Sequence, residues 1–232
     1  MTIDTLDQAL DDPQHDARRI RRAFIIATAF AALLWLIKSV ELIFSLELVE
    51  YGIYPRVLHG FKGIFIAPLI HGSFSHLFAN TAPTIILGST LIYNYSKSAT
   101  IAIPVIYIGS GLGVWLFARS AYHIGASGLT FGMMFFVFTI GVLRWDRKAI
   151  AFSLVVFFLY GSMIWGLFPS TPDISYESPL SGAMLGILLA ILLKNRDPAP
   201  PERHYSWEDE EDDMDYAEAQ KNKPPDIDRQ AN

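Results

Sequence analysis

Long apolar stretches separated by short polar segments dominate the first 194 residues of this chain. A helix that crosses a bilayer needs about 17–25 predominantly apolar residues. The pattern predicts six of them, at residues 20–45, 76–95, 100–118, 127–143, 149–168 and 178–194. Several are short and contain Gly, Ser, Thr or Pro, which favours helices packed against one another over helices surrounded by lipid. We therefore expect an all-α polytopic membrane protein whose partner is the lipid bilayer.

The polar flanks of these stretches divide the chain into three parts. Residues 1–18 are mostly polar, and we expect a mobile N-terminal segment. Basic residues before the first apolar run suggest a signal peptide as an alternative, but the run continues past Lys38 and Glu41 without a small-residue cleavage site. Residues 19–194 form the predicted membrane domain. Residues 195–232 are rich in Pro, Glu and Asp and predict a disordered acidic tail.

Composition and charge narrow the function. The chain is 52% hydrophobic, 18% charged and contains no cysteine, which excludes disulfides, thiolate chemistry and cysteine-ligated zinc. The net charge of −5 belongs to the tail, since Lys194 to Asn232 holds 12 acidic and 6 basic residues. This net charge therefore gives no information about a substrate. The sequence shows no feature that suggests nucleic-acid binding. With both termini in the cytoplasm, ten basic residues lie in cytoplasmic segments and three in outer loops, as the positive-inside rule requires.

A polar constellation falls at the outer ends of three predicted helices. Ser127 lies between Gly125 and Gly128 at the start of the fourth helix, where a tight turn can present its hydroxyl. An N-cap serine is the ordinary structural alternative. His76 and Asn80, four residues apart on one helix face, could form an oxyanion hole, although His76 could equally sit among lipid headgroups and His71 could cap a loop.

Glycines at four-residue spacing predict close helix packing. Gly128 and Gly132 lie on the fourth helix, and Gly182 and Gly186 on the sixth. Such pairs let backbones approach closely, which brings the start of the sixth helix beside Ser127. Gly109-x-x-x-Gly113 does the same for the third helix.

In this order, the motifs resemble the rhomboid family of intramembrane serine proteases over about residues 19–194. They are Gly52-Ile-Tyr-Pro-Arg56, Gly63-Ile, His71-x-x-x-x-His76-Leu-x-x-Asn80, Ser120-Ala-Tyr-His123-Ile-Gly-Ala-Ser-Gly128 and Gly182-x-x-x-Gly186. The resemblance implies a six-helix bundle in the bacterial cytoplasmic membrane, with a cavity open to the outer face and residues 47–75 as a membrane-lying loop. It implies cleavage of transmembrane substrates, and neither a cofactor nor a metal.

The resemblance also implies roles for single residues. Ser127 matches the nucleophile, His76 and Asn80 the oxyanion hole, and His71 a supporting histidine. The family's base is a histidine three residues before the first glycine of the sixth-helix pair. That position is Pro179, which has no base but is tolerated in the first turn of a helix.

Other residues are poor substitutes for this base. His123 could approach Ser127 if the turn folds back, Lys194 lies about 20 Å away at the other end of its helix, and Glu177 is expected to point to water. We therefore expect a rhomboid-type protease with impaired activity, or alternatively an inactive pseudoprotease that binds membrane-protein clients. A small transporter is disfavoured because the spans show neither paired charges nor an inverted repeat.

Overall fold

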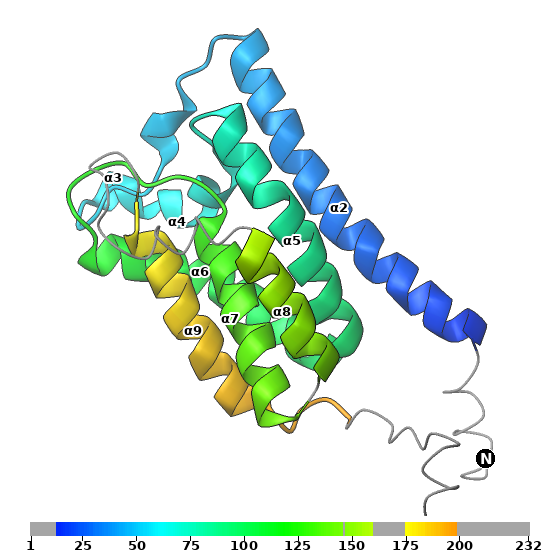
Figure 1. The fold of residues 1–232 in the computed structure, drawn as a ribbon. Helices are drawn as coiled ribbons and strands as arrows, with labels where there is room; N and C mark the ends of the chain where they lie inside the picture. Colours follow the sequence, from blue (N-terminus) through cyan, green and yellow to red (C-terminus); the bar gives the residue numbers. More distant parts are fainter. Residues whose placement is uncertain (1–12, 146, 160–174, 199–232) are drawn as a thin grey trace, which may run out of the picture. The chain divides into compact units, whose positions relative to one another are not determined.

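The computed structural model describes residues 13–145, 147–159 and 175–198, which are mostly helical. Figure 1 shows the long helices: α2 (Pro13–Ile43), α5 (Phe74–Asn94), α6 (Ser96–Phe117), α7 (Ser127–Leu143), α8 (Arg147–Leu159) and α9 (Glu177–Leu193). In these ranges the β-type pairing is a single antiparallel bridge between Ile53 and His123. The predicted all-α fold is confirmed.

The helix boundaries agree closely with the predicted spans, with one clear difference. α7 occupies the predicted residues 127–143, whereas α2 begins at Pro13, seven residues before the predicted start. Tertiary contacts explain the extension, because the Tyr93 hydroxyl donates to Asp16 Oδ1 at 2.8 Å and Arg19 Nη2 donates to the Tyr93 carbonyl at 3.1 Å. The polar first turns are thus held against the end of α5.

Parts of three predictions lie outside the described residues. These parts are residues 1–12 of the N-terminal segment, residues 160–168 of the fifth predicted span, and the tail from residue 199. In the described part of the chain, two helices are long and apolar enough to cross a membrane, Gln14–Ile43 and Ser96–Phe117. Ser127–Leu143 and Glu177–Leu193 are shorter apolar helices. The six-span topology therefore stays a prediction.

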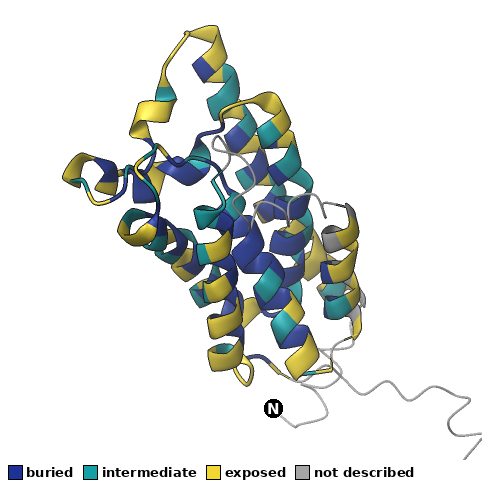
Figure 2. Cartoon of the chain, turned by 60° about the vertical axis from the view of Figure 1, so that its left-hand side comes forward, coloured by how far each residue is buried: buried dark blue, intermediate teal, exposed yellow. Residues whose placement is uncertain are grey.

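α7 is the central helix of the bundle. It contacts α5, α6, α8 and α9, and most of its residues are buried. Figure 2 shows the buried residues gathered in the interior of the bundle, where the helices face one another. α2 instead packs on α5 and leaves large apolar side chains exposed, among them Ile20, Phe24, Ile25 and Leu36. An apolar helix surface of this kind suits contact with lipid.

The backbones of α7 and α9 are in direct contact. A Cβ atom added to Gly182 would lie 1.9 Å from the carbonyl oxygen of Gly128, and one added to Gly186 would lie 2.2 Å from that of Gly132. Gly113 of α6 lies against Ser181 of α9. The glycine-mediated packing predicted from the spacing is therefore present, and it places the start of α9 beside the start of α7.

The connector between α2 and α5 is folded rather than irregular. It contains η1 (Leu48–Tyr51), α3 (Leu58–Phe61), α4 (Gly63–Ile66) and η2 (Ala67–Leu69). The connector packs on α6, where Tyr107 donates its hydroxyl to the Phe65 carbonyl at 2.7 Å and Trp115 Nε1 donates to the Val57 carbonyl at 3.0 Å. These bonds fix the connector beside the loop that leads to Ser127.

Candidate active site

Ser127 is the first residue of α7 and follows a tight turn. Gly125 has φ +106°, a conformation that favours glycine, and its N–H donates to the Ala67 carbonyl at 2.9 Å. Within the described residues the Ser127 hydroxyl has no hydrogen-bond partner. A serine that capped its own helix would accept a backbone N–H, but Ala126 is the N-cap and the cap has no side-chain hydrogen bond. The structural alternative for Ser127 is therefore not supported.

His76 and Asn80 flank this turn from α5. The His76 ring lies against Gly125 so closely that a Cβ atom on that glycine would be 2.6 Å from His76 Cε1. Asn80 is completely buried and donates from Nδ2 to the His76 carbonyl at 3.0 Å. An amide nitrogen carries two protons, so one remains for a further acceptor. The structure brings His76 to the serine turn and Asn80 to the Thr130 hydroxyl near the start of α7, and the catalytic role of both stays a prediction.

Thr130 links these two elements and was not identified from the sequence. Its hydroxyl lies 3.5 Å from Asn80 Oδ1, 3.1 Å from the Ala126 carbonyl and 3.3 Å from Thr84 Oγ1. Thr130 follows Ser127 by three residues and Thr84 follows Asn80 by four, so each lies one helical turn below a predicted site residue. This spacing is the signal that could have found them.

His71 supports the turn from the connector. It is 1% exposed, and its Nε2 accepts the N–H of Ala126 at 3.4 Å. Its ring packs edge-on against His76 with centroids 5.0 Å apart. Burial, with a smaller contribution from the charge of His76, lowers the pKa of His71 to about 3. The imidazole is therefore neutral near pH 7 and can accept a hydrogen bond, and its supporting role stays a prediction.

Pro179 occupies the first turn of α9 without breaking the helix. The first helical hydrogen bond runs from Leu180 N to the Tyr176 carbonyl at 3.1 Å, so the missing N–H of Pro179 had no partner to lose. The side chain is buried. The predicted base position therefore holds a residue without an ionisable side chain, inside an intact helix.

Two hydroxyls that the sequence reasoning missed stand beside this position. A Cβ atom on Gly128 would lie 2.7 Å from Ser178 Oγ and 2.8 Å from Ser110 Oγ. Both serines line a small cavity together with Ile53, Ala67, Pro68, Gly111, His123, Ile124, Gly125, Gly128 and Leu129. Ser178 precedes Gly182 by four residues and so shares its helix face, which is the signal in the sequence.

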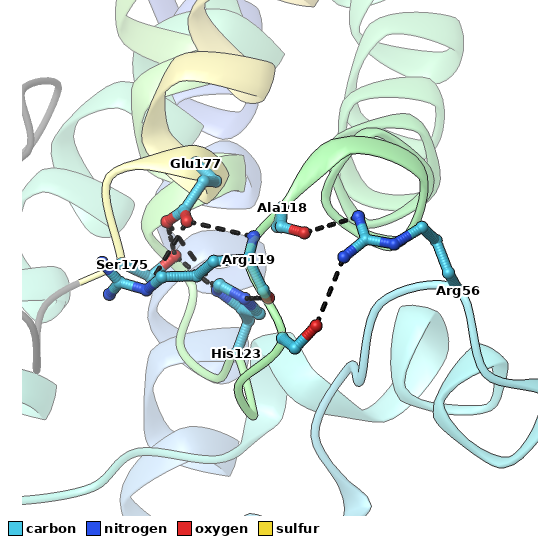
Figure 3. Close-up of polar contacts among 7 residues, drawn as sticks. Arg56, Ala118, Arg119, His123, Ser175 and Glu177 are labelled. Carbon is cyan, nitrogen blue, oxygen red and sulfur yellow. Dashed lines mark hydrogen bonds and ion pairs between the residues drawn. The ribbon is translucent and has the colours of Figure 1, made fainter.

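His123 does not act as the missing base in this arrangement. Its Nε2 faces the Arg119 carbonyl at 3.0 Å and therefore carries a proton, and its Nδ1 lies 2.7 Å from Ser175 Oγ. Figure 3 shows the ring among these partners. Both nitrogens are thus engaged away from Ser127.

The expectation that Glu177 points to water is wrong. Its side chain is 11% exposed and turns toward the loop between α6 and α7. Glu177 Oε1 accepts the Arg119 N–H at 3.4 Å and pairs with Arg119 Nε at 3.6 Å, while Oε2 accepts from Ser175 at 3.1 Å. Three donors compete with water for this carboxylate, as Figure 3 shows. Lys194 is the C-cap of α9, at the opposite end, as expected.

No three His, Asp or Glu side chains gather within the described ranges in a way that could hold a metal ion. The arrangement at the start of α7 therefore consists of a hydroxyl, amide and imidazole groups and free helix N–H groups. Chemically, such a set can stabilise a negatively charged oxygen beside a serine.

Comparison with known proteins agrees with this arrangement. The family model for the Rhomboid domain matches residues 59–196. The chain is 35% identical over 173 residues to the uncharacterized protein Rv1337 of Mycobacterium tuberculosis, covering 71% of this chain and 72% of that protein. It is 30% identical over 176 residues to the uncharacterized protein ML1171 of Mycobacterium leprae, covering 71% and 68%. The chain belongs to the rhomboid family of integral membrane proteins.

Proposed function

We propose that this chain is a rhomboid-type intramembrane serine protease whose cleavage of transmembrane segments is impaired because Pro179 replaces the base. One observation carries the proposal. The Ser127 hydroxyl stands at the start of α7 without a partner in the described part of the chain, while position 179 on the neighbouring helix is proline. A serine hydroxyl is a weak nucleophile unless an adjacent base activates it.

The nearby imidazoles do not replace that base. His71 accepts from Ala126, His123 is engaged by Arg119 and Ser175, and His76 packs against Gly125 where the oxyanion hole is expected. In subtilisin, loss of the catalytic histidine alone lowers kcat by about 10⁶. The remaining donors still give some acceleration over water. Residual cleavage is therefore expected to be very slow.

The six predicted spans supply the membrane setting of this proposal. Both termini lie in the cytoplasm, and the cavity opens to the outer face of a bacterial cytoplasmic membrane. The excess of basic residues in the cytoplasmic segments supports this orientation. The mycobacterial relatives support a bacterial source.

A pseudoprotease that binds membrane-protein clients is the second candidate. The intact first turn of α9 favours it, because proline at position 179 removes chemistry without disturbing the glycine contacts of Gly182 and Gly186. Such a chain would keep a surface for transmembrane helices and hold its clients without cutting them.

The test co-expresses the chain with a transmembrane substrate and compares it with Ser127→Ala, Pro179→His and Pro179→Ala. We expect little or no cleavage by the parent and clear cleavage by Pro179→His. Pro179→Ala is the matched control, since it removes the ring without adding a base. Any cleavage by the parent that disappears in Ser127→Ala contradicts the pseudoprotease, and parent cleavage as fast as that of Pro179→His contradicts the impairment. Reaction of Ser127 with a fluorophosphonate probe gives an independent measure, expected to be weak in the parent.

A further inference from the structure

The loop between α6 and α7, residues 118–126, has to be held in place because it presents Ser127. It contains no helix, and its turn depends on the positive φ of Gly125. Loops of this kind open locally at low cost when few contacts cross them. The position of Ser127 therefore depends on whatever ties this loop to its neighbours.

α9 offers this loop a fixed reference. The backbone of α9 touches that of α7 at Gly182 and Gly186, so α9 has little room to shift toward or along α7. Glu177 lies in the first turn of this helix. A bond from the loop to Glu177 thus ties a loop without regular structure to a rigid element.

His123 makes hydrogen bonds to three different parts of the chain. Its backbone exchanges two hydrogen bonds with Ile53, at 2.9 and 3.0 Å, which join the loop to the connector. Its ring bonds Arg119 within the loop and Ser175 just before α9. The side chain is 2% exposed. All four polar groups of this residue are fixed by partners, and Ser127 follows four residues later.

Glu177 holds the far side of the same arrangement. Ser175 donates a hydrogen bond to Glu177 Oε2, and the N–H and side chain of Arg119 approach Glu177 Oε1. The carboxylate therefore contacts Arg119 directly and the His123 ring through Ser175. Hydrogen bonds to a charged group are stronger than neutral ones, and the Glu177 carboxylate is largely shielded from water. Figure 3 shows Arg56 bonding Ala118 on the other side of the loop, at 2.7 Å.

We propose that His123 is the positioning residue of the turn that presents Ser127, and that Glu177 fixes His123 through Ser175. His123 acts through the backbone, not by proton transfer to Ser127. The inference rests on the proposed function, because the turn matters only if Ser127 is the reactive group. It predicts that breaking the His123 contacts loosens the turn at Ser127 without unfolding the bundle.

The test uses the absence of cysteine in the native chain. Ser127→Cys introduces one thiol at the turn, and the rate of its modification by a small methanethiosulfonate reagent is measured in detergent. His123→Leu, His123→Gln and Glu177→Gln are added to this parent. Asp197→Asn is the matched control, because Asp197 accepts the N–H groups of Lys97 and Ser98 at the opposite end of the bundle, at 2.8 and 3.1 Å.

We expect His123→Leu to raise the modification rate by about tenfold, since two ring hydrogen bonds no longer oppose local opening. Glu177→Gln should give a smaller increase. His123→Gln, whose amide can still donate to the Arg119 carbonyl, should restore most of the protection. Asp197→Asn should lower the melting temperature and leave the rate unchanged.

Two results overturn the proposal: an unchanged rate in both His123→Leu and Glu177→Gln, or an equal increase in Asp197→Asn, which marks a global effect. If His123→Leu does not fold, the modification rates of the two single variants Glu177→Gln and His123→Gln test the proposal instead. The measurement requires no cleavage. A failure of Pro179→His to become active would therefore reject the proposed function. The modification rates of the His123 and Glu177 variants would still show whether these residues hold the turn at residue 127.

Discussion

Replacing Gly182 with alanine tests whether the backbone contact of α7 and α9 determines the stability of the bundle. The added Cβ atom would lie 1.9 Å from the Gly128 oxygen, 2.7 Å from its carbonyl carbon and 3.0 Å from its Cα atom. All three are backbone atoms, so no side chain can turn aside. α9 has to move away from α7 by about 1.5 Å to restore ordinary contact distances.

The expected cost follows from this overlap. Overpacking of a tight interior costs about 1–3 kcal/mol, and a clash with backbone belongs at the upper end. Alanine gains about 1 kcal/mol over glycine from its helix propensity. A net loss of about 2 kcal/mol remains. For a chain of this size that corresponds to a fall in Tm of about 4–8 °C.

The assay is thermal unfolding of the purified chain in detergent, and Gly88→Ala of α5 serves as the control. A Cβ atom on Gly88 would lie 3.3 Å from the Ala27 Cβ atom and 4.0 Å from Met133 Sδ. These are close but tolerable contacts with side chains, so the propensity gain and the crowding nearly cancel. We expect its Tm to stay within about 3 °C of the parent.

An unchanged or raised Tm in Gly182→Ala refutes this reasoning. It would mean that α9 does not depend on direct backbone contact at this position. Equal losses in Gly182→Ala and Gly88→Ala would also contradict it, because the two sites differ in what the added atom meets.

Three further predictions concern the site and its supports. Gly125→Ala should abolish the fluorophosphonate labelling gained in Pro179→His, because the strained φ and the 2.6 Å approach to His76 Cε1 distort the turn; retained labelling would contradict this. The folded-state pKa of His71 is about 3 against an ordinary 6.5, so its contribution to stability is complete above about pH 6.5 and is lost progressively below it. Unfolding measured at pH 7 and 5 should show a loss of about 2 kcal/mol that is absent in His71→Asn; equal slopes would argue against it. Asp197→Ala should cost about 1 kcal/mol, measured as a lower Tm, since it removes the acceptor of two N–H groups in the first turn of α6.

The predictions that succeeded rest on local rules of the sequence. Apolar length gave the positions of the long helices, and the spacing of Gly182 and Gly186 gave the contact with α7. Pro179 in the first turn of α9 follows from the missing N–H groups of helix starts. These features depend only on neighbours within a turn or two along the chain.

The sequence predicted the wrong surroundings for Glu177, and the reason is physical. From its neighbours alone, a glutamate before a helix is expected to meet water, which solvates a charge best. In the folded chain, the loop between α6 and α7 brings Arg119, and the residues before α9 bring Ser175, within reach of the carboxylate. Arg119 lies 58 residues before Glu177, and this separation along the chain hides their proximity.

By itself, the sequence determined which polar side chains are present and in what order. It supplies a serine between glycines, two histidines with an asparagine, and a proline where we propose that the base is replaced, because these are properties of residue identity and order. Only the tertiary structure decided that the side chains of His123 and Glu177 bond to Arg119 and Ser175. The direction of a hydrogen bond depends on which groups are brought together in space, and several helices far apart in the chain set that arrangement.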